Sequence, residues 1–479
     1  MTVAVSCVES PKKEREALYK RFRSKLDTNP YLNRSIVSYQ ANKKLPFYRW
    51  LKYKEGFSSD FVAYAIKELT TSKGILLDPF AGTGSALFTA IKMGWDTIGI
   101  ELLPLGFFAI SSRLATARLG MNKFKRELEK IEGLKWSTFF DPKFKLVHVP
   151  ITEGAFPSET ERSIAGYRAY CDKIIDGNLK MLLDLACLSV LESVSYTRKD
   201  GQYLRWDFRA GKDRTKSNFD KGEIANFDSV IRDKLREFYE DLYNTDENIK
   251  SLFDKNSRKK ATGALDLRKG SCLEILPQMK EDSIDMVLTS PPYCNRYDYT
   301  RTYALELVYL GIDADKLKSL RQNMLSCTVE NKAKVNQLEH SYERSGQKKA
   351  FDTIMNVFKK QKALNEVLGI LERQGIAGEL NNSNIPNMVR NYFLEMAFVI
   401  YELGRILRSG GKVVMVNDNV RYAGEEVPVD LILSDFANSF GMKIKTIWKL
   451  GKGKGNSSQQ MGSHGRSELR KCVYVWIKD

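Results

Sequence analysis

Short apolar runs alternate with amphipathic stretches in the first part of the chain. Residues 75–77 form a fully apolar run, and residues 97–100 form a second one. Between them, the spacing of apolar residues over 85–93 predicts a helix. Another helix is expected over 58–72, because a Ser-Ser-Asp cap begins it and Gly74 follows its end. This part of the chain therefore predicts a helix followed by a strand–helix–strand unit.

The pattern is interrupted twice. Residues 121–262 are charged and irregular, with helical stretches near 160–195 and 224–243, and residues 312–385 are rich in Lys, Gln and Asn and show helical spacing. Outside them, seven short strands are expected, near residues 75, 97, 265, 284, 412, 442 and 471. The last two are joined by a loop at 451–468 without a helix, so we expect them to pair antiparallel. The sequence thus predicts an α/β fold with a mixed seven-stranded sheet and two largely helical insertions.

A buried strand runs into a rigid turn at 283–293. The strand must stop at Pro291-Pro292, because proline cannot donate to a sheet and fixes its own φ. Ser290 and Tyr293 are then held at the edge where open α/β sheets bind ligands. The Ser290 hydroxyl and the carbonyls before the prolines are acceptors, and Tyr293 offers a flat ring. Such groups suit a planar heterocycle with an exocyclic amine; the alternative is a plain turn after a core strand.

A glycine-rich turn, Asp78-Pro79-Phe80-Ala81-Gly82-Thr83-Gly84, follows the first strand. Gly82 and Gly84 let the backbone approach a ligand closely. The turn lacks the lysine of a phosphate-binding loop and the third glycine of a dinucleotide fingerprint, which argues against nucleoside triphosphates and NAD. Glu101 ends the second strand, where a carboxylate can accept both hydroxyls of an unmodified ribose. The alternative for Glu101 is a solvated acid at a strand end.

The charge and the cysteines narrow the class of protein further. The 479 residues carry a net charge of +17, which favours nucleic acid as partner, although a basic but solvated surface would give the same total. The seven cysteines are scattered and only three histidines occur, so we expect no metal site and reduced thiols in a cytoplasm. No signal peptide and no membrane-spanning run are apparent.

Together, the two motifs resemble those of the amino-methyltransferases that use S-adenosylmethionine to methylate DNA. The turn 78–84 is similar to their cofactor motif, and residues 289–293 are similar to their catalytic motif in its Ser-Pro-Pro-Tyr form. That form is typical of the cytosine-N4 enzymes, whereas the adenine-N6 enzymes more often have Asp or Asn first. The resemblance implies a Rossmann-like class I methyltransferase fold with its last strand antiparallel.

The resemblance also assigns residues to the cofactor and to catalysis. The implied catalytic residues are Ser290, Pro291, Pro292 and Tyr293. The implied cofactor residues are Tyr53, Phe57, Asp78, Pro79, Phe80, Ala81, Gly82, Thr83, Gly84, Glu101 and Ser271. In this family the aromatic residue of the turn packs on the cofactor, and the segment 53–57 holds its carboxylate end. The family often has an acidic residue after the glycine beyond the third strand, whereas here Gly270 is followed by Ser271.

The resemblance covers the core strands and the stretch before them, and it divides the chain into segments. These are a loosely packed N-terminal arm (1–44), the cofactor-binding part of the core (45–120), an insertion that is a candidate target-recognition region (121–262), the catalytic part of the core (263–311), a second helical insertion (312–385) and the C-terminal part of the core (386–479).

Two basic and aromatic clusters are candidate DNA contacts. The first contains Arg198, Lys199, Tyr203, Arg205, Trp206 and Arg209. Its alternative is a solvated loop with a buried tryptophan, in which case recognition would lie in 312–385 or in the loop 451–468. The second contains Arg296, Tyr297 and Tyr299, which continue the mouth of the catalytic pocket or simply begin a capped helix.

The implied reaction is direct methyl transfer to the exocyclic nitrogen of a base flipped out of double-stranded DNA. No cysteine follows a proline, so the nucleophile of the carbon-5 cytosine enzymes is absent, and Cys294 is interpreted as a wall residue. The first interpretation is a site-specific cytosine-N4 DNA methyltransferase, with a cognate restriction endonuclease as a candidate partner. Adenine-N6 methylation, RNA amino-methylation and a catalytically silent nucleic-acid-binding protein are the alternatives.

Overall fold

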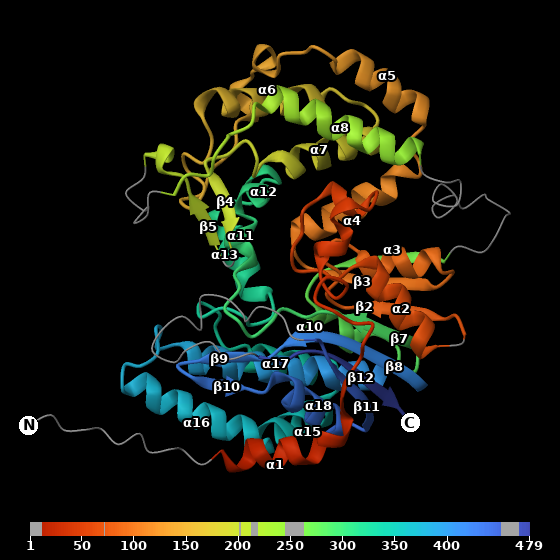
Figure 1. Cartoon of the computed structure of the whole chain (residues 1–479), viewed down its shortest axis with the longest axis vertical. Helices are drawn as coiled ribbons and strands as arrows, with labels where there is room; N and C mark the ends of the chain where they lie inside the picture. Colours follow the sequence, from red (N-terminus) through yellow and green to blue (C-terminus); the bar gives the residue numbers. More distant parts are fainter. Residues whose placement is uncertain (1–11, 71, 201–202, 212–218, 245–262, 452–468) are drawn as a thin grey trace, which may run out of the picture.

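A mixed eight-stranded sheet runs through the larger part of the protein (Figure 1). The computed structural model describes residues 12–70, 72–200, 203–211, 219–244, 263–451 and 469–479. The strand order across the sheet is β1 (Leu26–Thr28), β11 (Met442–Lys449), β12 (Lys471–Lys478), β8 (Leu407–Asp418), β7 (Ile284–Thr289), β2 (Ile75–Asp78), β3 (Asp96–Glu101) and β6 (Leu265–Lys269). The predicted α/β class is confirmed, and β1 is the one strand of this sheet that was not expected.

Strand direction brings several chain segments to one edge of the sheet. β6, β3, β2, β7 and β8 run parallel to one another, whereas β12 is antiparallel to both β8 and β11. The last residues of β2, β3, β7 and β8 are Asp78, Glu101, Thr289 and Asp418. Because carboxyl ends of parallel strands meet at the same edge, these residues converge where open α/β sheets bind ligands.

Helices cover both faces of the sheet, as the alternation of buried residues requires. One face packs on α17 (Ile385–Ile406), α18 (Val429–Ser439) and the short α10 (Cys272–Ile275). The other face packs on α2 (Ser59–Leu69) and α3 (Ser85–Lys92). Along β12, Tyr474 and Trp476 belong to the first face, and Val473 and Val475 belong to the second. α2 has the expected cap, because the Ser58 hydroxyl accepts a 3.1 Å hydrogen bond from the Phe61 N–H.

The first insertion forms a helical lobe with its own core, drawn at the top of Figure 1. Its elements are α5 (Met121–Ile131), α6 (Ser158–Asp172), α7 (Gly177–Val190), the hairpin β4 (Thr197–Asp200) and β5 (Tyr203–Trp206), and α8 (Phe227–Tyr243). Trp136 and Tyr167 meet edge to face at 4.8 Å in this core. α4 (Pro104–Thr116), α11 (Tyr299–Thr302) and α12 (Ala304–Tyr309) lie between the lobe and the sheet, so the lobe packs on both motif-bearing halves of the core.

The second insertion is packed largely against the sheet's own helices. It comprises α13 (Ala314–Asn323), α14 (Val335–Arg344), α15 (Lys348–Lys360) and α16 (Lys362–Ile376), and the small hairpin β9 (Val420–Tyr422) and β10 (Glu425–Val427) lies beside it. Phe351 of α15 and Leu364 and Leu371 of α16 are buried in the same core as α17. Most of the segment 312–385 is therefore a second layer over one face of the sheet.

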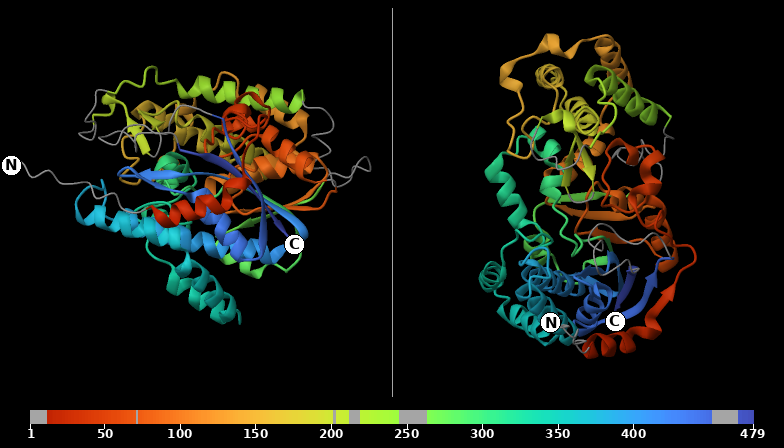
Figure 2. Two further views of the ribbon diagram at one scale, coloured as in Figure 1. Left: turned by 60° about the horizontal axis from the view of Figure 1, so that its bottom comes forward. Right: turned by 60° about the vertical axis from the view of Figure 1, so that its left-hand side comes forward.

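The expectation of a loosely packed N-terminal arm is wrong for the described residues 12–44. α1 (Lys13–Phe22) lies against helices of the C-terminal half (Figures 1 and 2) and buries Leu18 and Phe22. Arg15 forms ion pairs with Glu366 at 2.7 Å and with Glu425 at 2.9 Å. β1 then adds a parallel strand to β11. Few apolar residues stand among many charged ones in this segment, so its pattern concealed the packing face.

Candidate active site

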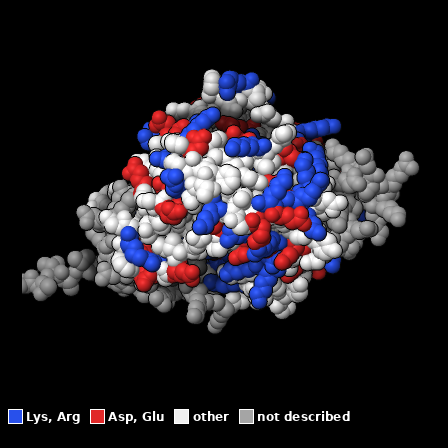
Figure 3. All heavy atoms as spheres, turned by 90° about the horizontal axis from the view of Figure 1, so that it is seen from above, with Lys and Arg blue, Asp and Glu red and all other residues white. Residues whose placement is uncertain are grey.

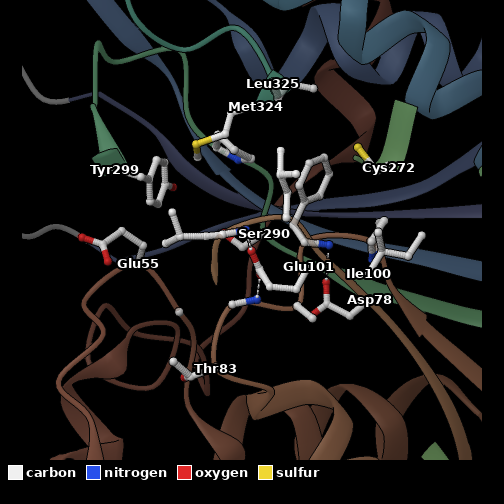
Figure 4. A pocket seen from close by; sticks show the side chains of 18 of the residues that line it. Glu55, Asp78, Thr83, Ile100, Glu101, Cys272, Ser290, Tyr299, Met324 and Leu325 are labelled. Carbon is white, nitrogen blue, oxygen red and sulfur yellow. Dashed lines mark hydrogen bonds between the residues drawn. The ribbon is translucent and has the colours of Figure 1, made fainter. Parts of the chain in front are cut away.

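Two adjoining pockets lie at the carboxyl edge of the parallel strands. The first pocket, shown in Figure 4, is bounded by the glycine-rich turn, the ends of β3 and β6, and the segment 53–57. The second pocket is bounded by the turn after β7, the end of β8, the start of β12 and the segment 54–57. The residues that line both pockets are Glu55, Gly56, Phe57, Ser290 and Tyr299. A group bound in one pocket would thus share a wall with a group bound in the other.

All residues assigned by resemblance to the cofactor line the first pocket, with one exception. Gly84 does not line it, although its φ of +83° requires glycine. A Cβ atom added to Gly84 would lie 2.8 Å from Phe88 Cε2 and 3.0 Å from Ile110 Cγ1. The missing side chain of Gly84 therefore makes room for the protein's own core, and the approach of its backbone to a ligand stays a prediction. Gly82, with φ +54°, does line the pocket.

Asp78 joins the glycine-rich turn to the strand that carries the proline motif. Its Oδ1 accepts a 2.7 Å hydrogen bond from the Thr289 hydroxyl and a 3.1 Å bond from the Phe80 N–H. Burial raises the pKa of Asp78 to about 7, although both hydrogen bonds act in the opposite direction. The turn after β2 and the end of β7 are thereby held in register.

Glu101 is buried beneath the same turn. One carboxylate oxygen accepts a 2.5 Å hydrogen bond from the Gly82 N–H, and the other accepts a 2.6 Å bond from the Leu103 N–H. Burial raises the pKa of Glu101 to about 8, against these hydrogen bonds. The structure thus excludes a solvated acid at this strand end. Glu101 also lines the first pocket, and its carboxyl group has more hydrogen-bonding sites than these two bonds use.

α4 supports the turn from the core side. The buried Arg113 donates a hydrogen bond to the Thr83 carbonyl, and its guanidinium lies 5.8 Å from the Phe88 ring centroid. Burial lowers the pKa of Arg113 to about 10. A Cβ atom on Gly106 would lie 2.4 Å from the Gly82 carbonyl oxygen, so helix and turn touch backbone to backbone. Sequence reasoning missed both residues, because their contacts depend on where α4 packs.

The proline motif divides between the two pockets. Pro292 lines the first pocket, Pro291 and Tyr293 line the second, and Ser290 lines both. The Ser290 hydroxyl lies 3.2 Å from the Tyr293 hydroxyl oxygen and 3.3 Å from the Val416 carbonyl oxygen, within donating distance of each. Burial raises the pKa of Tyr293. The side chains expected to act together are therefore adjacent, at the boundary between the pockets.

Glu55 stands at the same boundary and was not singled out from the sequence (Figure 4). Its two carboxylate oxygens accept hydrogen bonds from the Tyr297 and Tyr303 hydroxyls. Burial raises the pKa of Glu55, while both tyrosine hydrogen bonds lower it. Tyr303 in turn stacks on Tyr53 with 5.1 Å between the ring centroids, so the segment 53–57 is fixed by aromatic contacts and by the hydrogen bonds of the partly buried Glu55.

In the second basic and aromatic cluster, the two tyrosines line a pocket and the arginine does not. Tyr297 and Tyr299 line the second pocket, whereas Arg296 donates a 2.8 Å hydrogen bond to Asn381 and lines neither pocket. The alternative of a capped helix start is also observed, because Asp298 accepts a 2.9 Å hydrogen bond from the Thr300 N–H at the start of α11. Tyrosines at this helix start thus form the pocket wall.

The first cluster lies on the hairpin β4–β5, except for Arg209 in the turn after it, and the two faces of the hairpin have different surroundings. Arg198 and Arg209 are exposed, and Arg205 is partly exposed and lies 4.1 Å from the Phe219 ring centroid. Lys199 is buried, pairs with Glu306 and lies 4.5 Å from the Tyr303 ring centroid. Trp206 is buried in the helical lobe. The expectation that the whole cluster faces DNA is therefore wrong for Lys199 and Trp206, since residues of a strand alternate in direction.

Among the described residues, the outer face of the helical lobe carries a mixture of charges and no single basic patch. Seen from above in Figure 3, Lys and Arg side chains are interspersed with acidic and uncharged ones. Arg236 pairs with Glu132 at 2.6 Å on this lobe. The proposed basic loop at 451–468 lies, except for its first residue, outside the described residues.

Some other features bear on the chemistry. Across the described ranges, no group of three or more His, Cys, Asp or Glu side chains has the geometry of a metal site. Cys294 is buried and lines neither pocket. No helix among the described residues is long and apolar enough to span a membrane.

Comparison with known proteins identifies the family. Type II methyltransferase M.AvaI from Nostoc sp. is 45% identical over 481 aligned positions, which cover 99% of this chain and 95% of the relative. Type II methyltransferase M.BsoBI from Geobacillus stearothermophilus is 40% identical over 484 positions, covering 98% and 93%. Type II methyltransferase M.MvaI from Kocuria varians is 21% identical over 77% of this chain and 75% of its own length. No known family profile and no solved structure match the chain. With relatives this similar over nearly its whole length, the chain belongs to the type II methyltransferases.

Proposed function

We propose that this protein is a site-specific DNA methyltransferase that uses S-adenosylmethionine to methylate the N4 amine of a cytosine flipped out of double-stranded DNA. The observation that carries the proposal is the position of Ser290, which lines both pockets at the end of β7. A hydroxyl there can contact an amine held in the second pocket while facing a ligand held in the first.

The residues of the first pocket fit S-adenosylmethionine. The Glu101 carboxyl has hydrogen-bonding sites left for ribose hydroxyls, and the partly buried Phe80 offers a flat apolar surface for an adenine ring. Gly82 lets the backbone approach, and its added Cβ would lie 3.1 Å from the Tyr53 ring. Ser271 lines the same pocket and can bond a polar group of the ligand. When bound, S-adenosylmethionine supplies an electrophilic methyl group.

The second pocket fits a planar base. Tyr293, Tyr297 and Tyr299 line it, and an aromatic ring that stacks on a base contributes about 1–3 kcal/mol. A base inside a duplex cannot reach such a pocket, so it must be flipped out. The net charge of +17 supports attraction to the DNA backbone.

The proline motif orients the target amine for methyl transfer. The N–H groups of the target amine donate to the Ser290 hydroxyl and the Pro291 carbonyl, both of which are held by the rigid turn. These bonds make the nitrogen more tetrahedral and direct its lone pair toward the first pocket. Catalysis then comes from positioning and from acceptors arranged in advance, with no covalent intermediate on the protein.

Serine at the first position of the motif favours cytosine over adenine as the target, by resemblance to the cytosine-N4 enzymes. A restriction endonuclease acting on the same site is a proposed partner.

The direct test is methylation of genomic DNA with labelled S-adenosylmethionine, followed by nucleoside analysis and mapping of the modified site. We expect N4-methylcytosine in one short sequence. N6-methyladenine would retain the enzyme class and contradict the base assignment. Transfer of the label to RNA instead of DNA would favour an RNA amino-methyltransferase. Cofactor binding without any methylated product would favour a catalytically silent binding protein.

A further inference from the structure

Lys471 and Asp418 form an ion pair in the lining of the second pocket. Lys471 begins β12 and Asp418 ends β8, and the two residues are register partners in the antiparallel pair. Their side chains are 17% and 15% exposed, and both line the second pocket. A cation and an acid are thus built into the sheet edge, in the pocket that Pro291 and Tyr293 of the proline motif also line.

The pair leaves hydrogen-bonding capacity toward the pocket. The distance from Lys471 Nζ to Asp418 Oδ1 is 3.6 Å, which is an ion pair but longer than a hydrogen bond. Asp418 Oδ1 is buried and has no hydrogen-bond partner among the described residues. The Lys471 ammonium has three N–H donors. Burial lowers the pKa of Lys471, but Tyr293 and Asp418 together raise it above its usual value, so the group stays charged.

Lys471 lies close to the residues that are proposed to hold the amine. Its Nζ is 5.7 Å from the Tyr293 ring centroid, and the Ser290 hydroxyl is 3.2 Å from the Tyr293 hydroxyl. One aromatic ring therefore has an acceptor, Ser290, and a cationic donor, Lys471, beside it. A base stacked on that ring would meet both groups.

We propose that Lys471, positioned by Asp418, recognises the 2-carbonyl oxygen of the flipped cytosine and thereby selects cytosine over adenine. This inference rests on the proposed function. Cytosine has an acceptor, the 2-carbonyl, on the same edge as its amine, whereas adenine has a carbon-bound hydrogen at the corresponding place. A site built to bond a polar group discriminates against a base that lacks it, because the buried donor is then left unpaired.

The test compares Lys471→Met with wild type on two DNA duplexes that contain the mapped site. One duplex carries the target cytosine. The other carries a carbon-linked 2-aminopyridine, which keeps the amine and the ring nitrogen but has hydrogen in place of the 2-carbonyl. The matched control is Lys443→Met, the same change on β11 at a lysine whose side chain is 75% exposed. Calorimetric affinity for S-adenosylmethionine shows whether each variant retains the first pocket.

We expect Lys471→Met to lower kcat/KM on the cytosine duplex by about 10- to 100-fold, as for a lost hydrogen bond to a charged group. Wild type should lose a similar factor on the 2-aminopyridine duplex, and the variant should lose little more there, because the two changes remove the same bond. Asp418→Asn should shrink the wild-type preference for the cytosine duplex. Lys443→Met should behave as wild type.

Three results would overturn the inference while leaving the proposed function intact. One is N4-methylcytosine formed by Lys471→Met at the wild-type kcat/KM. Another is a wild-type enzyme that does not distinguish the two duplexes. If Lys471→Met lowers activity on both duplexes by the same factor, the lysine has a general structural role, and base selection lies elsewhere. The wild-type nucleoside analysis decides separately whether the proposed function itself holds.

Discussion

The Thr289 hydroxyl donates a 2.7 Å hydrogen bond to Asp78 Oδ1, and this bond connects the two motifs of the protein. Thr289 immediately precedes Ser290, and Asp78 begins the glycine-rich turn. Both residues are buried, with Asp78 2% exposed and Thr289 0% exposed. The position of the Ser290 hydroxyl relative to the first pocket is therefore fixed by a contact between strands that neighbour each other in space and lie far apart in sequence.

Thr289→Val tests that connection. The change keeps the shape of the side chain but leaves the buried Asp78 with one donor fewer, so we expect a loss of about 1–3 kcal/mol in the free energy of unfolding. Chemical denaturation measures the loss. Thr446→Val, whose hydroxyl makes an exposed 3.4 Å contact, is the control and should change stability little. Equal stability of the two variants would contradict a structural role for the Asp78 bond.

The buried carboxylate of Glu101 predicts a pH dependence of stability. Its pKa in the folded protein is about 8, raised by burial above the ordinary value of 4.5. Between these values the folded state keeps a proton that the unfolded state has released, so this group's contribution to stability falls as pH rises from about 4.5 to about 8. The Tm of the cofactor-free wild type, measured relative to Glu101→Gln, should decrease across that range. A constant difference between the two proteins would refute the assignment.

The two glycines of the turn should respond differently to substitution. At Gly84, φ is +83° and an added Cβ would meet Phe88 at 2.8 Å, so Gly84→Ala should destabilise the fold by about 1–3 kcal/mol. Gly82 lines the first pocket, and its added Cβ would press on Tyr53 at 3.1 Å. Gly82→Ala should therefore weaken S-adenosylmethionine binding more than Gly84→Ala does, relative to their losses in Tm. Calorimetry and thermal melts on both variants give the comparison.

The sheet and much of the lining of the first pocket could be predicted from the sequence, because the motifs that form them consist of residues that are adjacent in the chain. The apolar run before Asp78, the cap at Ser58 and the prolines after Ser290 need no knowledge of the rest of the chain. The second pocket could not be predicted in this way. Asp418 and Lys471 meet only because β12 inserts antiparallel beside β8. From the sequence, Lys199 is likewise expected on the surface, whereas in the structure it is buried and paired with Glu306.

Adjacent residues of β4 provide a paired test of DNA contact. Arg198 is exposed, so Arg198→Ala should weaken DNA binding and reduce the slope of log K against log salt by about 0.9 if it neutralises one phosphate. Lys199→Met instead leaves Glu306 buried without its cation, so it should cost about 3–5 kcal/mol of stability. Fluorescence anisotropy over a salt series and chemical denaturation separate the two effects. An unchanged slope for Arg198→Ala would move the phosphate contacts to other segments.

Substitutions at Ser290 and Tyr293 should affect two different steps, methyl transfer and capture of the flipped base. Ser290→Ala removes an acceptor for the target amine and leaves the first pocket's turn untouched, so kcat should fall about 100-fold or more while S-adenosylmethionine affinity is retained. Tyr293→Phe keeps the stacking ring and removes only the hydroxyl beside Ser290. Tyr293→Ala removes the ring as well, so the free energy of binding the flipped base should weaken by a further ~1–3 kcal/mol.

Single-turnover rates and the fluorescence of 2-aminopurine placed beside the target base measure these two steps independently. The order of activities should be wild type, then Tyr293→Phe, then Tyr293→Ala, with base flipping impaired only in the alanine variant. Because Ser290 lies on the shared wall of the two pockets, its loss should leave flipping intact and slow the methyl transfer itself. If Ser290→Ala transfers methyl groups at the wild-type rate, the acceptor at the end of β7 takes no part in the reaction, and the amine must be oriented by another group of the second pocket.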